Sequence, residues 1–234
     1  MSNTTVADPR KLAAAESAAA LVQDGMIVGL GSGSTASLAV RALGRRVAEG
    51  LRFTGIPTSE KTAELARSLS MTLSTLAEHS RIAITIDGAD EVELGSLDLI
   101  KGLGGALLRE KLVAAATERL VIVVDESKLV TRLAAERRPL PVEVVAFGWQ
   151  TTAERLKALG ADWTLRTVEG GRPFVTDGGN YTLDCRFQTV PPAIDLQRQL
   201  DQTIGVVDHG LFLGMTSQVI IGAANGVSVL RRES

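Results

Sequence analysis

The stretch IAITIDGADEVELGSLDLIKGLGGALLREK, from Ile82 to Lys111, gathers the side chain types that proton transfer requires. Its ionisable candidates are Asp87, Asp90, Lys101 and Glu110. A carboxylate can take a proton from a carbon next to a carbonyl group, while an ammonium group and backbone amides stabilise the enediolate oxygen that results. The stretch therefore predicts an acid/base site for an anionic substrate.

Local patterns indicate how the chain would position these groups. Residues Ile82 to Ile86 are apolar and β-branched, which predicts a buried strand of a parallel sheet. The segment Asp87-Gly88-Ala89-Asp90 then follows at the carboxyl end of the strand, where open α/β sheets bind their ligands. A second apolar segment, Asp98 to Ile100, could bring Lys101 to the same edge of the sheet.

A glycine-rich loop follows Lys101, and backbone amides in such a loop can approach a ligand closely. Its residues are Gly102, Leu103, Gly104 and Gly105. A helix is expected from Ala106 to Thr117, with Glu110 in an early turn. The dipole of a helix favours negative charge at the amino terminus, so both a bound anion and an ionised Glu110 suit this position.

A second loop could hold a phosphate group. Met26 to Gly31 reads as a strand and a helix is expected from Ala36 to about Leu43; the residues between them are Ser32, Gly33, Ser34 and Thr35. Hydroxyl groups, glycines and a helix amino terminus suit phosphate binding. Gly31 to Ala36 also fits G-x-G-x-x-A, a weak match to the dinucleotide fingerprint. No acidic residue ends the next expected strand before Glu60, which favours a phosphomonoester.

A third strand, Leu120 to Val124, ends in Asp125-Glu126-Ser127-Lys128, and Lys128 would add a second ammonium group. Taken singly, each of these features has an ordinary structural explanation. The aspartates suit turns, the lysines suit a solvated surface, Glu110 suits a helix face and the Ser32 to Thr35 loop suits a helix cap. Only their combination favours a catalytic site.

That combination resembles the type A ribose-5-phosphate isomerases. The motifs GLGSGSTA, PTSEKTAEL, DGADEV, KGLGGALLREK and DESK occur here in the order in which that family has them, and the resemblance covers nearly the whole chain. Ser32 and Leu108 stand where many relatives have threonine, and Leu103 stands where many have glycine. Leu103 could therefore strain a loop that requires positive φ.

The resemblance implies interconversion of ribose 5-phosphate and ribulose 5-phosphate in the pentose phosphate pathway, without a metal or an organic cofactor. By resemblance, Glu110 is the catalytic base, Lys101 faces the enediolate and Asp87 helps transfer a hydroxyl proton. The expected substrate-binding residues are Ser32, Gly33, Ser34, Thr35, Asp87, Gly88, Ala89, Asp90, Lys101, Gly102, Leu103, Gly104 and Lys128. A homodimer or homotetramer is also implied.

Composition excludes several other classes of protein. A net charge of −2 and an aromatic content of 3% argue against a nucleic-acid surface. No apolar run reaches membrane-spanning length, and the amino terminus lacks the layout of a secretion signal, so the cytoplasm is the expected compartment. Cys185 is the single cysteine and is expected in a core. His79 and His209 lack metal-ligand spacing.

The order of elements predicts an α/β fold with two domains. Strands near Met26, Leu51, Ile82 and Leu120 alternate with helices, which indicates a Rossmann-like parallel sheet with helices on both faces. The expected catalytic domain comprises residues 1–133 and 208–234. Residues 134–207 read as a smaller inserted α+β domain with the ferredoxin-like βαββαβ order, serving as a lid or an oligomer contact. A hairpin from Val219 to Leu230 would return to the first sheet.

Two other classes of function remain open at this level. One is an enzyme on a related fold, either a coenzyme A transferase or an aminosugar-phosphate deaminase. A transferase would need a glutamate nucleophile placed for attack on a thioester. The other is a non-catalytic sugar-phosphate sensor attached to a transcription regulator, which would need a DNA-binding module and would bind the sugar phosphate without turnover.

Overall fold

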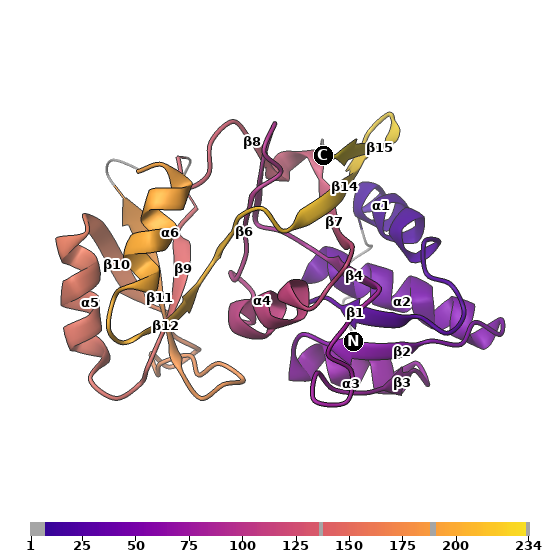
Figure 1. Cartoon of the computed structure of the whole chain (residues 1–234), viewed down its shortest axis with the longest axis horizontal. Helices are drawn as coiled ribbons and strands as arrows, with labels where there is room; N and C mark the ends of the chain where they lie inside the picture. Colours follow the sequence, from indigo (N-terminus) through magenta and orange to yellow (C-terminus); the bar gives the residue numbers. More distant parts are fainter. Residues whose placement is uncertain (1–7, 136–137, 188–190, 233–234) are drawn as a thin grey trace. The chain divides into compact units, whose positions relative to one another are not determined.

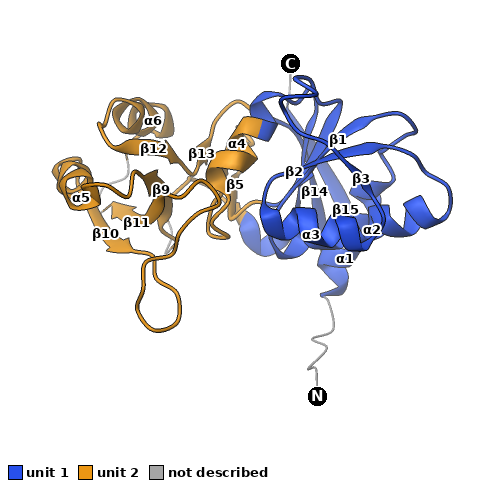
Figure 2. Ribbon diagram, turned by 90° about the horizontal axis from the view of Figure 1, so that it is seen from below, with its two compact units in different colours: residues 1–88, 113–128, 216–234 blue, residues 89–112, 129–215 orange. Residues whose placement is uncertain are grey.

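The computed structural model describes residues 8–135, 138–187 and 191–232 (Figure 1). The chain forms two compact units, which Figure 2 colours separately. Unit 1 comprises residues 1–88, 113–128 and 216–234, and unit 2 comprises residues 89–112 and 129–215.

Unit 1 is built on a seven-stranded sheet with the order β15-β14-β7-β4-β1-β2-β3. Its strands are β1 (Ile27–Leu30), β2 (Thr54–Pro57), β3 (Thr72–Leu73), β4 (Ile84–Asp87), β7 (Leu120–Asp125), β14 (Thr216–Ala223) and β15 (Gly226–Arg231). Every neighbouring pair is parallel except β14 with β15, which is antiparallel. The predicted parallel sheet and the predicted returning hairpin are both confirmed.

Helices cover both faces of this sheet, as predicted. The helices of unit 1 are α1 (Pro9–Ala19), α2 (Ser34–Ala48), α3 (Glu60–Ser68) and the last turn of α4 (Leu107–Ala115). Val28 of β1 and Ile84 of β4 belong to the core that α1 and α2 complete, and Figure 2 shows α1, α2 and α3 along one side of the sheet. Side chains of a strand alternate between faces, and Ile56 of β2 packs with Val113 of α4 on the other side.

Two glycines in and after β1 make room for polar side chains of β4. A Cβ atom on Gly29 would lie 2.0 Å from the hydroxyl oxygen of Thr85, and one on Gly31 would lie 2.3 Å from Oδ1 of Asp87. Thr85 and Asp87 are both almost completely buried. The close approach of β1 and β4 therefore requires glycine at both positions.

Unit 2 contains an antiparallel sheet with the order β10-β11-β9-β12. Its elements are β9 (Leu140–Val144), α5 (Trp149–Ala158), β10 (Ala161–Leu165), β11 (Tyr181–Phe187), α6 (Ala193–Asp201) and β12 (Val206–His209). This succession is the βαββαβ order of a ferredoxin-like domain, so the predicted architecture is confirmed. Leu156 of α5 and Leu200 of α6 are fully buried in the core that both helices share with the sheet.

A second four-stranded sheet of unit 2 has the order β13-β6-β5-β8. Its strands are β5 (Glu91–Glu93), β6 (Leu99–Ile100), β8 (Leu129–Val130) and β13 (Leu211–Phe212). Strand β6 lies just before Lys101 and pairs with β5 and β13, so this segment belongs to the second sheet and not to the parallel sheet. The expectation that it brings Lys101 to the edge of the parallel sheet stays a prediction. The position of a strand as short as β6 depends on the strands that it pairs with. Its partner β13 lies more than a hundred positions further along the chain, so local sequence does not reveal this pairing.

The predicted domains, residues 1–133 with 208–234 and residues 134–207, remain a prediction. The compact units group the chain differently, because residues 89–112, 129–133 and 208–215 belong to unit 2. Ile100, Val130 and Leu211 of the second sheet share a hydrophobic core with Leu140 and Val142 of β9, which explains this grouping.

Across the described residues, the helices are too short or too polar for any of them to span a lipid bilayer.

Replacing Gly29 with alanine tests the close packing of β1 on β4. The new Cβ atom would lie 2.0 Å from the Thr85 hydroxyl and 2.8 Å from a methyl group of Val113, so we expect Gly29→Ala to lower the free energy of unfolding by about 1–3 kcal/mol. Gly104→Ala is the matched control, because its Cβ atom would meet no atom within 4 Å. Urea denaturation of both variants measures the difference, and equal stabilities would contradict the packing argument.

Candidate active site

Lys101 and Glu110 form a buried ion pair within unit 2. Lys101 directly follows β6, and Glu110 lies in the first turns of α4. The Lys101 ammonium nitrogen is 3.2 Å from Oε1 of Glu110, and the two residues are only 3% and 5% exposed. An ammonium group attracts a carboxylate strongly at this distance, and a general base must be ionised to accept a proton. The arrangement suits proton abstraction with an adjacent stabilising cation.

The loop between Lys101 and α4 takes its shape from two glycines. Gly102 and Gly105 have φ angles of +106° and +83°, which side chains rarely allow. A Cβ atom on Gly105 would also lie 2.4 Å from the Phe174 ring. The expected strain at Leu103 is not present, because positive φ among the described residues other than glycine occurs only at Ser70, Leu97 and Ala134.

Asp90 ties this loop to the start of unit 2. Its Oδ2 accepts a hydrogen bond of 2.9 Å from the Leu103 amide, and its own amide donates to the Ile100 carbonyl at 2.8 Å. The Arg138 guanidinium group donates to the Asp90 carbonyl oxygen. The structure therefore brings four residues predicted for the site together in unit 2: Asp90, Lys101, Leu103 and Glu110.

Arg166, the residue directly after β10, holds the same loop, and sequence reasoning missed it. Its guanidinium group donates to the carbonyl oxygens of Gly102 at 2.8 Å and Leu103 at 3.3 Å. Two further hydrogen bonds go to the Asp184 carboxylate, one of them 3.0 Å long. Arg166 lies in no glycine-rich or acidic motif. The only sequence signal was an arginine directly after one expected strand and an aspartate in the next, and such pairs are common.

In unit 1, Asp87 ends β4 with its carboxylate buried against the loop that follows β1. Its Oδ1 accepts hydrogen bonds from the Ser32 amide at 3.0 Å and the Gly88 amide at 2.7 Å. The missing side chain of Gly31 leaves the space that this carboxylate occupies. The predicted neighbourhood of Asp87, Gly88 and the Ser32 loop at the strand ends therefore exists within unit 1.

The Ser32 hydroxyl group belongs to a cluster of hydroxyl groups from the PTSEKT motif. It lies 2.8 Å from the hydroxyls of Thr58 and Ser59 and 3.1 Å from that of Thr62. Thr62 in turn donates to the Gly31 carbonyl at 3.1 Å. The Ser32 hydroxyl group therefore helps to fix the loop, and its expected contact with a substrate stays a prediction. The serine and threonine spacing in PTSEKT was the signal for this role.

The first turn of α2 presents backbone amides beside Ser34 and Thr35. Gly33 is the N-cap residue, has a φ angle of +95° and supplies no side-chain hydrogen bond to the helix. Ser34 is exposed, whereas Thr35 is 7% exposed. The first amides of a helix need partners from outside it, and a phosphate group is suited to them.

Lys128 lies in a short 3-10 helix, η1 (Glu126–Lys128), directly after β7. Lys11 of α1 was not singled out from the sequence, yet its ammonium nitrogen is 3.6 Å from Oδ2 of Asp125 at the end of the same strand. Burial works to raise the pKa of Asp125, but hydrogen bonds from Ser127 and the charges of Lys11 and Lys128 outweigh it and hold the pKa below its ordinary value. Two lysines thus lie near one carboxylate.

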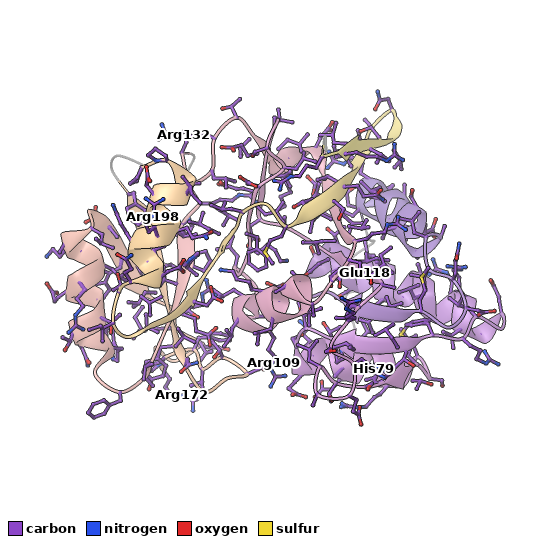
Figure 3. The ribbon with its side chains drawn as sticks, viewed as in Figure 1. His79, Arg109, Glu118, Arg132, Arg172 and Arg198 are labelled. Atoms are coloured by element: carbon purple, nitrogen blue, oxygen red, sulfur yellow. The ribbon has the colours of Figure 1, made fainter. Side chains whose placement is uncertain are left out.

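Other polar side chains of unit 2 have structural contacts. Arg109 precedes Glu110 in α4, projects outward (Figure 3) and lies 3.6 Å from Asp177. Burial raises the pKa of the Cys185 thiol to about 12, in agreement with the predicted core role. Within the described ranges, no group of three or more His, Cys, Asp or Glu side chains is arranged to hold a metal ion.

A cavity of about 450 Å³ in unit 2 contains none of the residues predicted for the site. It is lined by Lys111, Gln197, Asp201, Val206, Val207, Asp208, His209, Leu211, Leu213 and Met215. The His209 ring is fully buried, its Nδ1 accepts the Leu211 amide at 3.2 Å, and its Nε2 is 3.0 Å from Asp201. These contacts give His209 a structural role in unit 2.

The fold has a parallel sheet with helices on both faces and a ferredoxin-like sheet, and a buried lysine–glutamate pair lies on either side of a glycine-rich loop. These features are typical of the α/β class of enzymes. Comparison with known proteins narrows this class. The family described as ribose 5-phosphate isomerase A (phosphoriboisomerase A) matches residues 54–226. The chain is 56% identical to the ribose-5-phosphate isomerase A of Gloeobacter violaceus over 223 residues, which is 95% of this chain and 96% of that protein.

Solved structures agree with this assignment. Ribose 5-phosphate isomerase A from Methanocaldococcus jannaschii is 40% identical, with a TM-score of 0.90 over 95% of this chain and 98% of that one. A D-ribose-5-phosphate isomerase in complex with phospho-erythronic acid is 34% identical, with a TM-score of 0.91 over 95% and 98% of the two chains. The chain belongs to the ribose 5-phosphate isomerase A family.

The buried His209 predicts a loss of stability in acid. Burial and the nearby Lys111 charge lower its pKa below the ordinary 6.5, although Asp208 and Asp201 oppose the shift. Below about pH 6.5 the unfolded chain therefore binds a proton that the folded chain does not, and stability falls as pH drops toward the folded pKa. The slope from this group is at most about 1.4 kcal/mol per pH unit.

We expect His209→Gln to remove this part of the pH dependence. The free energy of unfolding of both proteins is measured by urea denaturation from pH 8 to pH 5. The native chain should lose more stability than the variant below pH 6.5, and parallel curves would show that His209 titrates alike in both states.

Proposed function

We propose that the buried pair of Lys101 and Glu110 is the acid/base centre of this enzyme. As a member of the ribose 5-phosphate isomerase A family, the chain interconverts D-ribose 5-phosphate and D-ribulose 5-phosphate, a reaction of the pentose phosphate pathway. The observation that carries the proposal is the distance of 3.2 Å between two almost completely buried, oppositely charged groups. Buried charges are rare unless a pairing or a function retains them.

The proposed reaction begins with the open-chain sugar phosphate. The Glu110 carboxylate takes the proton from C2 of the aldose, the C2–H electron pair forms a C1=C2 double bond, and the π pair of the C1 carbonyl moves onto the C1 oxygen to give an enediolate. The ammonium group of Lys101 stabilises the negative oxygen. The C2 hydroxyl proton moves to the C1 oxygen, Glu110 returns its proton to C1, and the C2 carbonyl of the ketose forms; the reverse direction uses the same steps. No electron leaves the substrate, so the reaction needs no redox partner.

Asp87 and Asp90 receive the roles that the family resemblance implies. Asp87 moves a proton between the hydroxyl oxygens on C1 and C2, and Asp90 binds sugar hydroxyl groups. Their places support these roles, because Asp87 ends a strand of the parallel sheet and Asp90 already accepts a hydrogen bond from the glycine-rich loop. Gly88, Ala89, Gly102, Leu103 and Gly104 complete the proposed contacts to the substrate through their backbone.

The phosphate group is assigned to unit 1. The amides at the start of α2, the hydroxyl groups of Ser34 and Thr35, and the ammonium group of Lys128 are its proposed partners. Ser32 is proposed to act by shaping this loop, because its amide and its hydroxyl group already have hydrogen-bond partners in the protein. Lys11 joins this group on the strength of its position beside Asp125.

The alternative functions lack comparable support. The coenzyme A transferase, the deaminase and the sugar-phosphate sensor were possible from the fold pattern alone. The relatives described above, at 34% to 56% identity, are all named as ribose-5-phosphate isomerases. The cytoplasm, expected from the sequence, is the proposed compartment.

Replacing Glu110 with glutamine tests the acid/base centre. The amide keeps the shape of the side chain but cannot take a proton from carbon, so we expect turnover to fall by about 10² to 10⁴ while substrate binding changes little. The assay follows ketose formation from ribose 5-phosphate in the presence of a strong chelator and without added cofactor. Activity of the native chain under these conditions is expected, since every proposed step uses protein side chains.

The matched control for this variant is Glu118→Gln. Glu118 is an exposed glutamate that follows α4 (Figure 3), and we expect native turnover from this variant. If Glu110→Gln instead loses substrate binding and keeps its turnover number, Glu110 is a substrate ligand and the proposed base is wrong.

A homodimer or homotetramer is the proposed assembly, and exposed apolar side chains of unit 2 support it. Val145, Phe147 and Ile204 are 42%, 95% and 77% exposed, and the Val145 amide donates to the Gly205 carbonyl beside Ile204. Exposed apolar groups that lie together commonly mark protein interfaces.

Light scattering after size exclusion should therefore give a mass of two or four chains of 24.7 kDa. Phe147→Glu should shift this mass toward the single chain, because a carboxylate in an apolar interface must be desolvated. Val227→Glu, at an exposed valine of β15 in unit 1, is the control. A native mass of 24.7 kDa at all concentrations would contradict the proposal.

A further inference from the structure

Phe212 of β13 lies beside the ammonium groups of two lysines of unit 2. Its ring centroid is 5.6 Å from the Lys101 nitrogen and 5.1 Å from the Lys111 nitrogen, and its side chain is fully buried. An aromatic ring carries negative charge density on its face and attracts a cation within about 6 Å. The ring is therefore a partner of the same ammonium group that pairs with Glu110.

Backbone contacts fix the position of this ring relative to Lys101. Strand β13 pairs with β6, which places Phe212 opposite Leu99 and Leu211 opposite Ile100. The next residue, Lys101, donates its amide to the Gly210 carbonyl at 2.9 Å. A Cβ atom on Gly210 would lie 2.3 Å from the Lys101 carbonyl oxygen, so the two chains are as close as glycine allows.

The same segment, residues 208–212, also holds the helix that carries Glu110. Lys111, the next residue of α4, donates to the Asp208 carboxylate and, at 2.7 Å, to the His209 carbonyl oxygen. Burial lowers the pKa of Lys111, and the Asp208 charge opposes this shift. Residues 208 and 209 bind Lys111, the neighbour of Glu110, while residues 210 and 212 contact Lys101. One short segment therefore positions both members of the Lys101–Glu110 pair.

We propose that Phe212 is a positioning residue for the isomerisation, whose ring holds the Lys101 ammonium group in place without neutralising its charge. This proposal rests on the roles proposed for Lys101 and Glu110. When Glu110 takes up the substrate proton it loses its negative charge, and its attraction for Lys101 weakens. A carboxylate in place of the ring would hold Lys101 but would weaken its attraction for the enediolate. An aromatic ring attracts the cation at every stage, because the ring does not change its protonation state.

An apolar residue that only fills space would serve packing equally well, so the test must change the electrostatics of the ring and leave its size nearly unchanged. Site-specific replacement of Phe212 by phenylalanines with one, two and three ring fluorines does this, because fluorine withdraws the charge density that attracts a cation. We expect kcat to fall with each fluorine, to about a tenth of the native value with three, while KM and the unfolding temperature stay near native values.

The same series at Phe187 is the matched control. Phe187 of β11 is 9% exposed and packs in a hydrophobic core of unit 2. Fluorination there should leave kcat unchanged. Phe212→Leu, which removes the ring but keeps an apolar side chain, should lower kcat at least as much as three fluorines do.

Each outcome separates this proposal from the one on which it rests. Equal kcat values across the Phe212 series, together with a collapse of turnover in Glu110→Gln, would overturn the positioning role and leave the acid/base centre intact. Native turnover in Glu110→Gln would overturn the acid/base centre itself. A parallel fall in kcat and unfolding temperature across the Phe212 series would show that the ring acts through packing, which also contradicts the proposal.

Discussion

The burial of an ammonium group and a carboxylate side by side is the constraint on which unit 2 depends. Removing either charge from water costs several kcal/mol, and the cost is recovered only when the partner stays close and the surrounding polar groups are well placed. Lys101 and Glu110 meet this condition at 3.2 Å, from a strand end and a helix that are nine positions apart in sequence. The glycine-rich loop between them must therefore have one conformation, and hydrogen bonds from other parts of the chain hold it there.

Those contacts come from three separate parts of the chain. Arg166, directly after β10, binds the carbonyl oxygens of Gly102 and Leu103, and Asp90 binds the Leu103 amide. Phe174 fills the space that a side chain on Gly105 would need. Residues of the predicted insert 134–207 therefore hold the glycine-rich loop directly, a more specific task than the lid or oligomer contact predicted for them. That prediction remains open beside it.

Sequence reasoning predicted most of the fold because the strongest patterns are local. Alternating apolar strands and helices predicted the parallel sheet, and the ordered motifs predicted which strand ends carry polar residues. Strands β5, β6, β8 and β13 were harder to predict, because two or three residues carry too little periodicity and pair with partners far along the chain. For the same reason Arg166 and Phe212 went unnoticed. Arg166 contacts the glycine-rich loop and Phe212 contacts Lys101, in both cases between distant segments of the chain, which no local spacing records.

The hydroxyl group of Ser32 shows why a motif residue and a ligand contact must be distinguished. Its hydroxyl partners are Thr58, Ser59 and Thr62, and its amide binds the Asp87 carboxylate. A change at Ser32 would therefore move Asp87 and the start of α2 together. Because a threonine at this position would keep the hydroxyl group, the loop can retain its hydrogen bonds with either residue, while alanine would leave three buried hydroxyl groups with one partner fewer. The motif GLGSGSTA thus encodes a loop shape first, and the proposed phosphate binding would depend on the amides and side chains that this shape presents.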